Sequence, residues 1–467
     1  MTAENLVLIT VDALRHDALG CAGSSYASTP NLDDLANEGV RFEQAISNGP
    51  RTQASFPSIM GSLYPLVAGE RRGLPLETTT LAEAASGAGL TTAGFNPSNP
   101  FLTRETGYDR GFDLFIDFWD VHDRTGSGGK TGALATMKKN IHDSIGRRSL
   151  GFLMLLQALL LEEGGQNLTG RFLTDRATAW LQAQDGPFFM WLHFMDVHFP
   201  YQPLPGRRTF RDRLSFLNGM AGLTAGNPSP AVNALKRLYG DRVDLVDGYI
   251  GELVDSLKDL GLKERTTIVV TSDHGEQLGE HGRWAHGPDL HEELIRVPLI
   301  LNGPGLAGPR RIERQVELLG LAPTLLDLLG ISAPPSFLGS SFAPLALAHS
   351  GNGSDIIFSE TMHCGSRLSR SGISDTFTVS SCREAGWKFI HDTEDNSEEL
   401  YDLDTDPDER TNVALQHPDR TAHFRHLIDQ HRRDTASLAS AYECDGKRSS
   451  TPDDAEMRRR LAALGYL

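Results

Sequence analysis

Acidic and imidazole side chains follow short apolar runs at three places that lie far apart in the sequence. The residues at the ends of these runs are Asp12, Asp196 with His198, and Asp273 with His274. Each run is typical of a buried parallel strand, and open α/β sheets bind their ligands at the carboxyl ends of such strands. Carboxylate oxygens and an imidazole nitrogen suit a hard or borderline divalent cation, which would offset the cost of burying the carboxylates. The pattern therefore predicts a metal site at one edge of a sheet.

Thr52 is the candidate for an attacking hydroxyl. It lies between a strand expected over residues 40–45 and a helix expected over residues 55–63, with Pro57 near the helix start. Unpaired N–H groups and the dipole at a helix N-terminus favour an anionic substrate, and metal coordination would lower the pKa of the hydroxyl. A hydroxyl at this place also serves as a helix N-cap, and the stretch taken alone favours the cap.

His198 and His286 are the candidates for proton transfer. Either could protonate a leaving oxygen, because histidine titrates near physiological pH. Taken singly, each is more often a packed or surface histidine, and we interpret His281 as structural. A two-metal arrangement is the alternative, in which Asp196, His198 and His286 hold a second ion.

The expected elements form two groups along the chain. Strands and helices alternate up to about residue 345, which predicts a three-layer αβα fold with a mostly parallel central sheet. Residues 96–118 are expected to form a long loop near the site. From about residue 355, four short strands and a helix over residues 419–431 predict a small antiparallel sheet. We therefore divide the chain into a catalytic α/β domain, residues 1–345, and a C-terminal subdomain, residues 346–467.

Composition and charge restrict the possible partners. The chain has 467 residues, which allows a large core, and its net charge of −17 argues against a nucleic-acid partner. Four widely spaced cysteines without a Cys-x-x-Cys pair favour a reducing compartment. The first residues carry no basic run and no cleavage site, so we expect no signal peptide and a cytoplasmic location.

Residues 150–161 form a nearly uninterrupted apolar segment. It is shorter than the roughly 20 residues that a membrane span needs, so we expect no transmembrane segment. A core or lid helix is the main interpretation, and contact with a membrane surface is the alternative.

Several segments resemble the sulfatase family, which belongs to the alkaline phosphatase superfamily. The similar segments are Asp-Ala-Leu-Arg-His-Asp-Ala-Leu-Gly-Cys at 12–21, Ser-Ile-Met-Gly-Ser-Leu-Tyr-Pro at 58–65, Thr-Ser-Asp-His-Gly-Glu-Gln-Leu-Gly-Glu-His-Gly at 271–282, Glu-Glu-Leu-Ile-Arg-Val-Pro-Leu-Ile at 292–300, and Leu-Tyr-Asp-Leu-Asp-Thr-Asp-Pro-Asp-Glu at 400–409. The resemblance implies an alkaline phosphatase-like fold and a hydrolase with one divalent metal, or two in some relatives. The family's metal ligands fall on Asp12, Asp273 and His274, its nucleophile on Thr52, and its substrate-contacting histidine on His198.

The chain also departs from the family pattern. Sulfatases of the formylglycine type carry Cys or Ser in a Cys/Ser-x-Pro-x-Arg pattern, where this chain has Thr52, Ala54 and Phe56, so no formylglycine can form. Ala13 replaces a second acidic ligand, and His286 stands where sulfatases usually carry a lysine.

The expected substrate contacts differ as well. The strand expected over residues 90–95 is followed by Asn96 and Asn99 rather than by the family's Lys-x-His pair. Arg51 could replace the missing arginine only loosely. We take Arg51, Asn96 and Asn99 as the candidate substrate-binding residues.

The sequence thus leads to three hypotheses. The first is a metal-dependent hydrolase that cleaves sulfuric esters by in-line attack of Thr52, with Ca, Mg, Mn or Zn as the cation. Its substrate would be a small anionic ester, namely a sulfated or phosphorylated glycan, lipid or metabolite. The second is a phosphodiester or phosphonate hydrolase or a phosphotransferase on the same scaffold, because threonine nucleophiles occur in those branches of the superfamily. The third is a protein that binds an anion or a glycan without catalysis.

Overall fold

The computed structural model describes residues 3–69, 73–118, 120, 169–199, 201, 229–306, 308–347, 353–364 and 376–444. Our expectations for the apolar segment 150–161 concern residues outside the described ranges. Within those residues, no helix combines the length and the apolar character that crossing a membrane requires.

A nine-stranded sheet forms the centre of the molecule, in the order β10-β2-β9-β6-β1-β5-β3-β4, with β11 paired to β2. Its strands are β1 (Asn5–Val11), β2 (Val40–Ile46), β3 (Thr91–Phe95), β4 (Leu114–Ile116), β5 (Phe188–Phe194), β6 (Thr266–Thr271), β9 (Arg296–Asn302), β10 (Arg310–Ile312) and β11 (Val316–Glu317). Strand β9 is antiparallel to both of its neighbours, β2 and β6, and the other pairs are parallel. The predicted mostly parallel sheet is confirmed.

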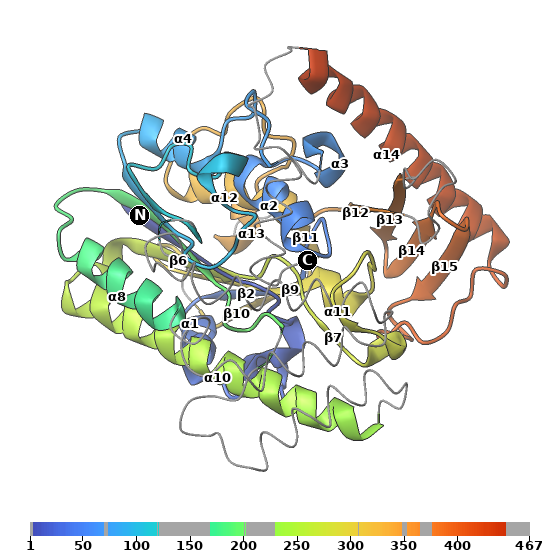
Figure 1. Cartoon of the computed structure of the whole chain (residues 1–467), viewed down its shortest axis with the longest axis horizontal. Helices are drawn as coiled ribbons and strands as arrows, with labels where there is room; N and C mark the ends of the chain where they lie inside the picture. Colours follow the sequence, from blue (N-terminus) through green and yellow to red (C-terminus); the bar gives the residue numbers. More distant parts are fainter. Residues whose placement is uncertain are drawn as a thin grey trace, which may run out of the picture.

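Helices cover both faces of this sheet (Figure 1). One face carries α1 (Pro30–Glu38), α8 (Thr169–Leu181) and α10 (Ser229–Asp259), and the other carries α2 (Thr52–Gly61), α4 (Leu81–Gly87) and α12 (Leu321–Leu328). The sequence of β1 is apolar because both faces of the strand are buried. Ile9 packs into the core on the α10 side, and Leu8 packs into the core on the α2 side. Because each fully buried side chain of this size contributes roughly 1.5–3 kcal/mol, the two cores hold the strands in register.

The strand order brings the ends of β1, β5 and β6 together. Strand β1 lies between the other two and is parallel to both. Its last residue is opposite Phe194, and the next backbone N–H, that of Asp12, donates to the Phe194 carbonyl at 2.8 Å. The chain then turns at Ala13, whose φ of 59° is left-handed, and the Leu14 N–H donates to Ser272 Oγ at 2.9 Å. Asp12 and the residues after β6 are therefore fixed beside each other.

The C-terminal part of the chain forms a four-stranded antiparallel sheet, as predicted. Its strands are β12 (Ile356–Cys364), β13 (Thr376–Glu384), β14 (Trp387–Asp392) and β15 (Ser397–Asp402), and α14 (Pro418–Cys444) packs on one face of it (Figure 1). This sheet supports the loop before α2, because the Asn48 side chain donates to the Phe358 carbonyl and the Glu360 N–H donates to the Asn48 carbonyl. Our domain boundary at residue 345 stays a prediction.

Three expectations about element bounds were wrong. Helix α2 begins at Thr52 rather than at residue 55, so Pro57 lies inside the helix. Strand β4 lies within the segment that we expected to be a loop. Its apolar stretch is short and has acidic neighbours, which hid it in the sequence, and packing of Phe115 against the ring of Trp191 holds it in the sheet. Helix α14 is longer than expected, because packing against the antiparallel sheet outweighs the weak helical pattern of its charged sequence.

Candidate active site

Three unused ligand atoms converge at the carboxyl edge of the central sheet. Within the described part of the chain, Asp12 Oδ1, Asp273 Oδ2 and His274 Nε2 make no hydrogen bond of normal geometry, although all three side chains are fully buried. His274 Nε2 lies 3.6 Å from each of the two carboxylate oxygens. The other carboxylate oxygen of Asp273 accepts the N–H groups of His274 at 3.0 Å and Ala13 at 3.3 Å, which fixes its direction. The structure thus brings the three predicted metal ligands together.

This donor set fits a divalent cation. Burial and the nearby charge of Asp12 hold the pKa of Asp273 well above its ordinary value, because two adjacent buried carboxylates repel each other. Burial opposes the charged form of Asp12 too, but the neighbouring histidines outweigh it and hold the pKa of Asp12 below its usual range. His274 Nδ1 bonds the Gly275 carbonyl at 2.8 Å, which leaves Nε2 as a lone-pair donor, and burial lowers the pKa of His274 to about 3. A cation beside these atoms would relieve both the repulsion and the missing contacts.

Thr52 is the first residue of α2 and lies against these carboxylates. Its Oγ1 donates to Asp12 Oδ2 at 3.2 Å. The helix N-cap is Arg51, and no side chain caps the helix there. The N-cap interpretation of Thr52 was therefore wrong: its hydroxyl contacts the carboxylate of Asp12 instead of capping its own helix.

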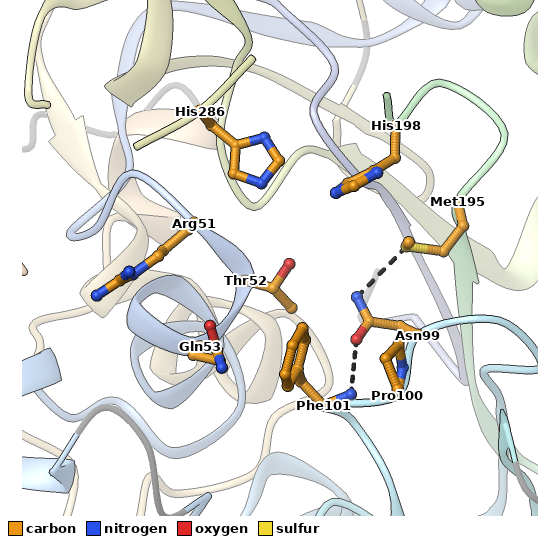
Figure 2. Close-up of a pocket in the computed structure, with 9 residues that line it drawn as sticks. All are labelled: Arg51, Thr52, Gln53, Asn99, Pro100, Phe101, Met195, His198 and His286. Carbon is orange, nitrogen blue, oxygen red and sulfur yellow. Dashed lines mark hydrogen bonds between the residues drawn. The ribbon is translucent and has the colours of Figure 1, made fainter. Parts of the chain in front are cut away.

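His198 and His286 lie on the side of the pocket toward which the Thr52 hydroxyl points (Figure 2). Their ring centroids are 4.9 Å apart. His198 Nδ1 bonds the Phe199 carbonyl at 2.6 Å, and His286 Nδ1 bonds Glu276 Oε1 at 2.9 Å, so the Nε2 atoms of both rings remain for other contacts. Burial opposes a charge on His286, but Glu276 outweighs it and raises the pKa of His286.

Glu276 was missed by the sequence analysis. It is completely buried, and its second oxygen accepts the hydroxyl hydrogen of Tyr201 at 2.7 Å. The only sequence signal was its position two residues after His274, in a segment without helical or strand periodicity.

The opposite wall of the pocket is formed by the loop after β3. Asn99, Pro100 and Phe101 come from this loop, and Met195 follows β5 (Figure 2). The Asn99 amide donates to Asp12 Oδ2 at 3.1 Å. The predicted substrate-binding residue Asn99 therefore lies in the pocket and also contacts a metal-ligand candidate.

The other predicted residues differ in their positions. Arg51 lines the pocket, but its side chain extends away from Thr52 and donates to the Met362 carbonyl of β12 (Figure 2). Asn96 is buried behind the pocket, where its amide bonds the carbonyls of Asn99 and Leu102 and so shapes the loop. It does not line the pocket, because the turn of this loop brings forward only the second asparagine.

Asp196, which the two-metal alternative required, lies elsewhere. It is close to Gly170 of α8, and its charge raises the pKa of Tyr249 on α10, together with the larger effect of burial. Asp196 thus has α8 and α10 among its neighbours. The second ion of that alternative stays a prediction.

The chain belongs to the sulfatase family. The family, described as Sulfatase, matches residues 4–331, and a second one, described as N-sulphoglucosamine sulphohydrolase, C-terminal, matches residues 279–434.

Curated relatives include arylsulfatases and a steryl-sulfatase. The chain is 34% identical over 284 residues to arylsulfatase K of Xenopus laevis, an alignment that covers 53% of this chain and 52% of that protein. The chain thus spans about half the length of this relative. It is 27% identical to the steryl-sulfatase of Rattus norvegicus, over 74% of this chain and 70% of that protein. It is 25% identical to an arylsulfatase of Clostridium perfringens, over 91% and 93% of the two chains.

Solved structures share the fold. A phosphonate monoester hydrolase of Agrobacterium radiobacter has a TM-score of 0.66 at 21% identity, over 94% of this chain and 96% of that one. A 2-O GAG sulfatase has a TM-score of 0.68 at 19% identity, over 93% of each chain. These likenesses establish the alkaline phosphatase-like three-layer architecture.

Proposed function

We propose that the protein is a metal-dependent hydrolase that cleaves sulfuric esters of small anionic substrates, with Thr52 as the attacking group. The observation that supports this proposal most strongly is the position of the Thr52 hydroxyl. It lies at the N-terminus of a ten-residue helix and donates to one oxygen of Asp12. The other oxygen of Asp12 lies near the two ligand atoms without hydrogen bonds, Asp273 Oδ2 and His274 Nε2. A cap or a packing residue has no need of such a contact.

Asp12, Asp273 and His274 would hold one divalent cation. Bound there, the ion would lower the pKa of the Thr52 hydroxyl and offset negative charge on the substrate. Two carboxylates with one imidazole suit Mn or Zn well, while Ca and Mg prefer oxygen ligands alone.

The protein's own groups supply the remaining parts of the reaction. Asp12 Oδ2 orients the hydroxyl of Thr52 and accepts its proton during in-line attack, so that the bond from Oγ1 to sulfur or phosphorus forms as the bond to the leaving oxygen breaks. The N–H groups and dipole at the start of α2 favour the negative charge of the transferring group. His198 or His286 then donates a proton to the leaving oxygen from Nε2, and Glu276 holds His286 in the orientation that this transfer requires. Water then hydrolyses the Thr52 ester and restores the hydroxyl.

A phosphodiester or phosphonate hydrolase, or a phosphotransferase, is the second candidate. It is favoured by the threonine at the position where formylglycine-type sulfatases carry Cys or Ser, and by Ala54 and Phe56 in place of the rest of that motif. His286 replaces a permanently charged lysine with a group that titrates, which changes the charge presented to the substrate.

A substrate panel separates these candidates. The purified protein, loaded in turn with Mn, Zn, Ca and Mg, is assayed with an aryl sulfate, an aryl phosphate, an aryl phosphodiester and an aryl phosphonate. We expect the highest kcat/KM for the aryl sulfate. A higher value for the phosphodiester or the phosphonate would establish the second candidate instead.

Thr52→Ala tests whether the protein is a catalyst at all. We expect kcat to fall on the order of 10³-fold or more, because removing a nucleophile removes the covalent route. Ser55→Ala is the matched control, since the Ser55 hydroxyl on the same helix donates to the carbonyls of Gly49 and Arg51 rather than to the metal-ligand candidates. Equal activity of the two variants would exclude Thr52 as the nucleophile, and a wild type that turns over none of the panel substrates would support a binding protein without catalysis.

A further inference from the structure

His193 is a buried imidazole beside the proposed metal ligands that neither the sequence analysis nor the mechanism assigns. It lies in β5, is only 1% exposed, and its Nε2 is 3.4 Å from Asp12 Oδ2. The ligand atoms of His193, Asp12 and Asp273 all lie within 4.8 Å of one another. On spacing alone, His193 could be either a metal ligand or a group that acts through Asp12.

The two sides of the Asp12 carboxylate separate these roles. The unused oxygen, Oδ1, faces His274, whose Nε2 is 3.6 Å away. His193 faces the other oxygen, Oδ2, which already accepts from Thr52 at 3.2 Å and from Asn99 at 3.1 Å. A cation held by Asp12 Oδ1, Asp273 and His274 would therefore contact the oxygen of Asp12 that faces His274, whereas His193 faces the other oxygen.

The surroundings of His193 fix its ring in this place. Its Nδ1 bonds the Thr10 hydroxyl at 2.9 Å, and that hydroxyl accepts the indole N–H of Trp191 at 3.0 Å. Phe56, which stands where formylglycine-type sulfatases carry an arginine, packs edge-on against the imidazole with ring centroids 5.1 Å apart. The ring can rotate only by breaking the contact with Thr10.

Asn99 connects His193 to Asp12. Its amide oxygen accepts the Phe101 N–H at 2.9 Å, so its NH₂ group must point toward Asp12 Oδ2 and toward His193 Nε2, which is 3.3 Å away. One NH₂ group has two hydrogens and can serve both acceptors. Because Nε2 accepts from Asn99, it has no hydrogen to donate to Asp12, so His193 holds the Asp12 carboxylate through the amide of Asn99.

We propose that His193 is a positioning residue for Asp12, and that it keeps Oδ1 turned toward the cation and Oδ2 turned toward the Thr52 hydroxyl. The inference rests on the proposed function, because it takes Asp12 as a metal ligand and Thr52 as the nucleophile. Hydrogen-bonded partners of ligating carboxylates generally change metal affinity or activity about 10–100-fold when they are removed.

The test measures Mn²⁺ binding to the metal-free full-length protein by isothermal titration calorimetry. We expect His193→Ala to weaken Mn²⁺ binding 10–100-fold, and His193→Gln, whose amide can reach Asp12, to recover part of that loss. At saturating Mn²⁺, His193→Ala should lower kcat with little change in KM, because Thr52 loses its orientation. His431→Ala is the matched control, since His431 is another buried histidine bonded to a carboxylate, Glu360, in the C-terminal sheet.

The nitrogen couplings in the electron spin echo spectrum of bound Mn²⁺ decide between a ligand and a positioning residue. We expect coupling to one imidazole, that of His274, in the wild type and in both His193 variants. Loss of a nitrogen coupling in these variants would make His193 a ligand and overturn the inference. Unchanged Mn²⁺ affinity in a folded His193 variant would overturn it while leaving the proposed function intact, whereas a wild type that binds no Mn²⁺ would overturn both.

Discussion

Replacing Asp273 by asparagine should have opposite effects on the metal-free and the metal-bound protein. Asp273 Oδ1 accepts two backbone N–H groups, from Ala13 and His274, so an asparagine will keep its oxygen there. Its NH₂ group then takes the place of Oδ2 and points hydrogens toward the position where the cation would bind. The change removes a charged ligand without removing the contacts that hold the loop.

The sizes of both effects can be worked out. The ligand oxygens of Asp12 and Asp273 lie within 4.8 Å of each other, so two charged carboxylates would repel each other by at least about 3.5 kcal/mol at an effective dielectric constant of 20, and asparagine removes this repulsion. Removing a residue that is hydrogen-bonded to a metal ligand typically weakens metal binding 10–100-fold. Removing a ligand itself should therefore weaken metal binding 100-fold or more. A 100-fold loss corresponds to about 2.7 kcal/mol less stabilisation of the folded state at saturating metal.

Thermal unfolding in EDTA and in excess Mn²⁺ measures both effects. We expect Asp273→Asn to unfold at a higher temperature than the wild type in EDTA and at a lower temperature in Mn²⁺. Asp247→Asn is the matched control, because Asp247 is another buried aspartate that accepts backbone N–H groups, from Asn31 and Leu32. An equal Mn²⁺-dependent shift in the wild type and Asp273→Asn would refute the assignment of Asp273 as a ligand.

Three further predictions concern pH and metal. Burial raises the pKa of Glu317 to about 7, although the hydrogen bond from the Asn48 amide opposes this rise. The free energy of unfolding should therefore fall as pH rises from about 4.5 to 7. In denaturant titrations at pH 8, Glu317→Gln should be more stable than the wild type by up to about 3 kcal/mol. Burial opposes the charged form of His291, but hydrogen bonds from its ring to Asp289 and Glu399 raise its pKa to about 10. Its contribution to stability should be complete below about pH 6.5 and lost as pH rises through about 10, and unfolding free energies of His291→Gln should lack this decline; an equally steep decline in the variant would exclude His291 as its cause. Dialysis against EDTA should abolish turnover and Mn²⁺ should restore it, whereas full activity in the chelated protein would argue against a metal-dependent reaction.

The sequence predicted those parts of the site that depend on strand ends. Asp12 and Asp273 each follow an uninterrupted apolar run, and parallel pairing of such strands places their ends together. His274 follows Asp273 directly and Thr52 precedes an expected helix, and the family resemblance fell on both of these candidates. The three-layer fold could be predicted for the same reason, because strands buried on both faces are apolar at every position.

The direction of the Thr52 hydroxyl could not be predicted, because it depends on contacts distant in the sequence. The start of α2 is set by the preceding loop, in which Ser47 donates to the Asp273 carbonyl and Asn48 bonds the C-terminal sheet. Local sequence alone favoured an N-cap. Long-range pairing, which no short window contains, turns the hydroxyl toward Asp12 instead.

His193 and Glu276 could not be predicted for related reasons. A single histidine in an apolar strand is usually a packed core residue, and only the neighbouring strand shows that its ring faces Asp12. Glu276 lies in a turn without periodicity, and its partner His286 is brought near by the short hairpin of β7 (Gln277–Leu278) and β8 (Trp284–Ala285).

The central claim is that Thr52 attacks the substrate and carries the transferred group. The most direct measurement is peptide mass spectrometry of the Mn²⁺-loaded protein after acid quenching during turnover of the best substrate in the panel. We predict one sulfuryl or phosphoryl group on Thr52, at a level that matches any initial burst of product. A burst of one product per protein with an unmodified Thr52 peptide, or with the group on Ser55, would contradict the account.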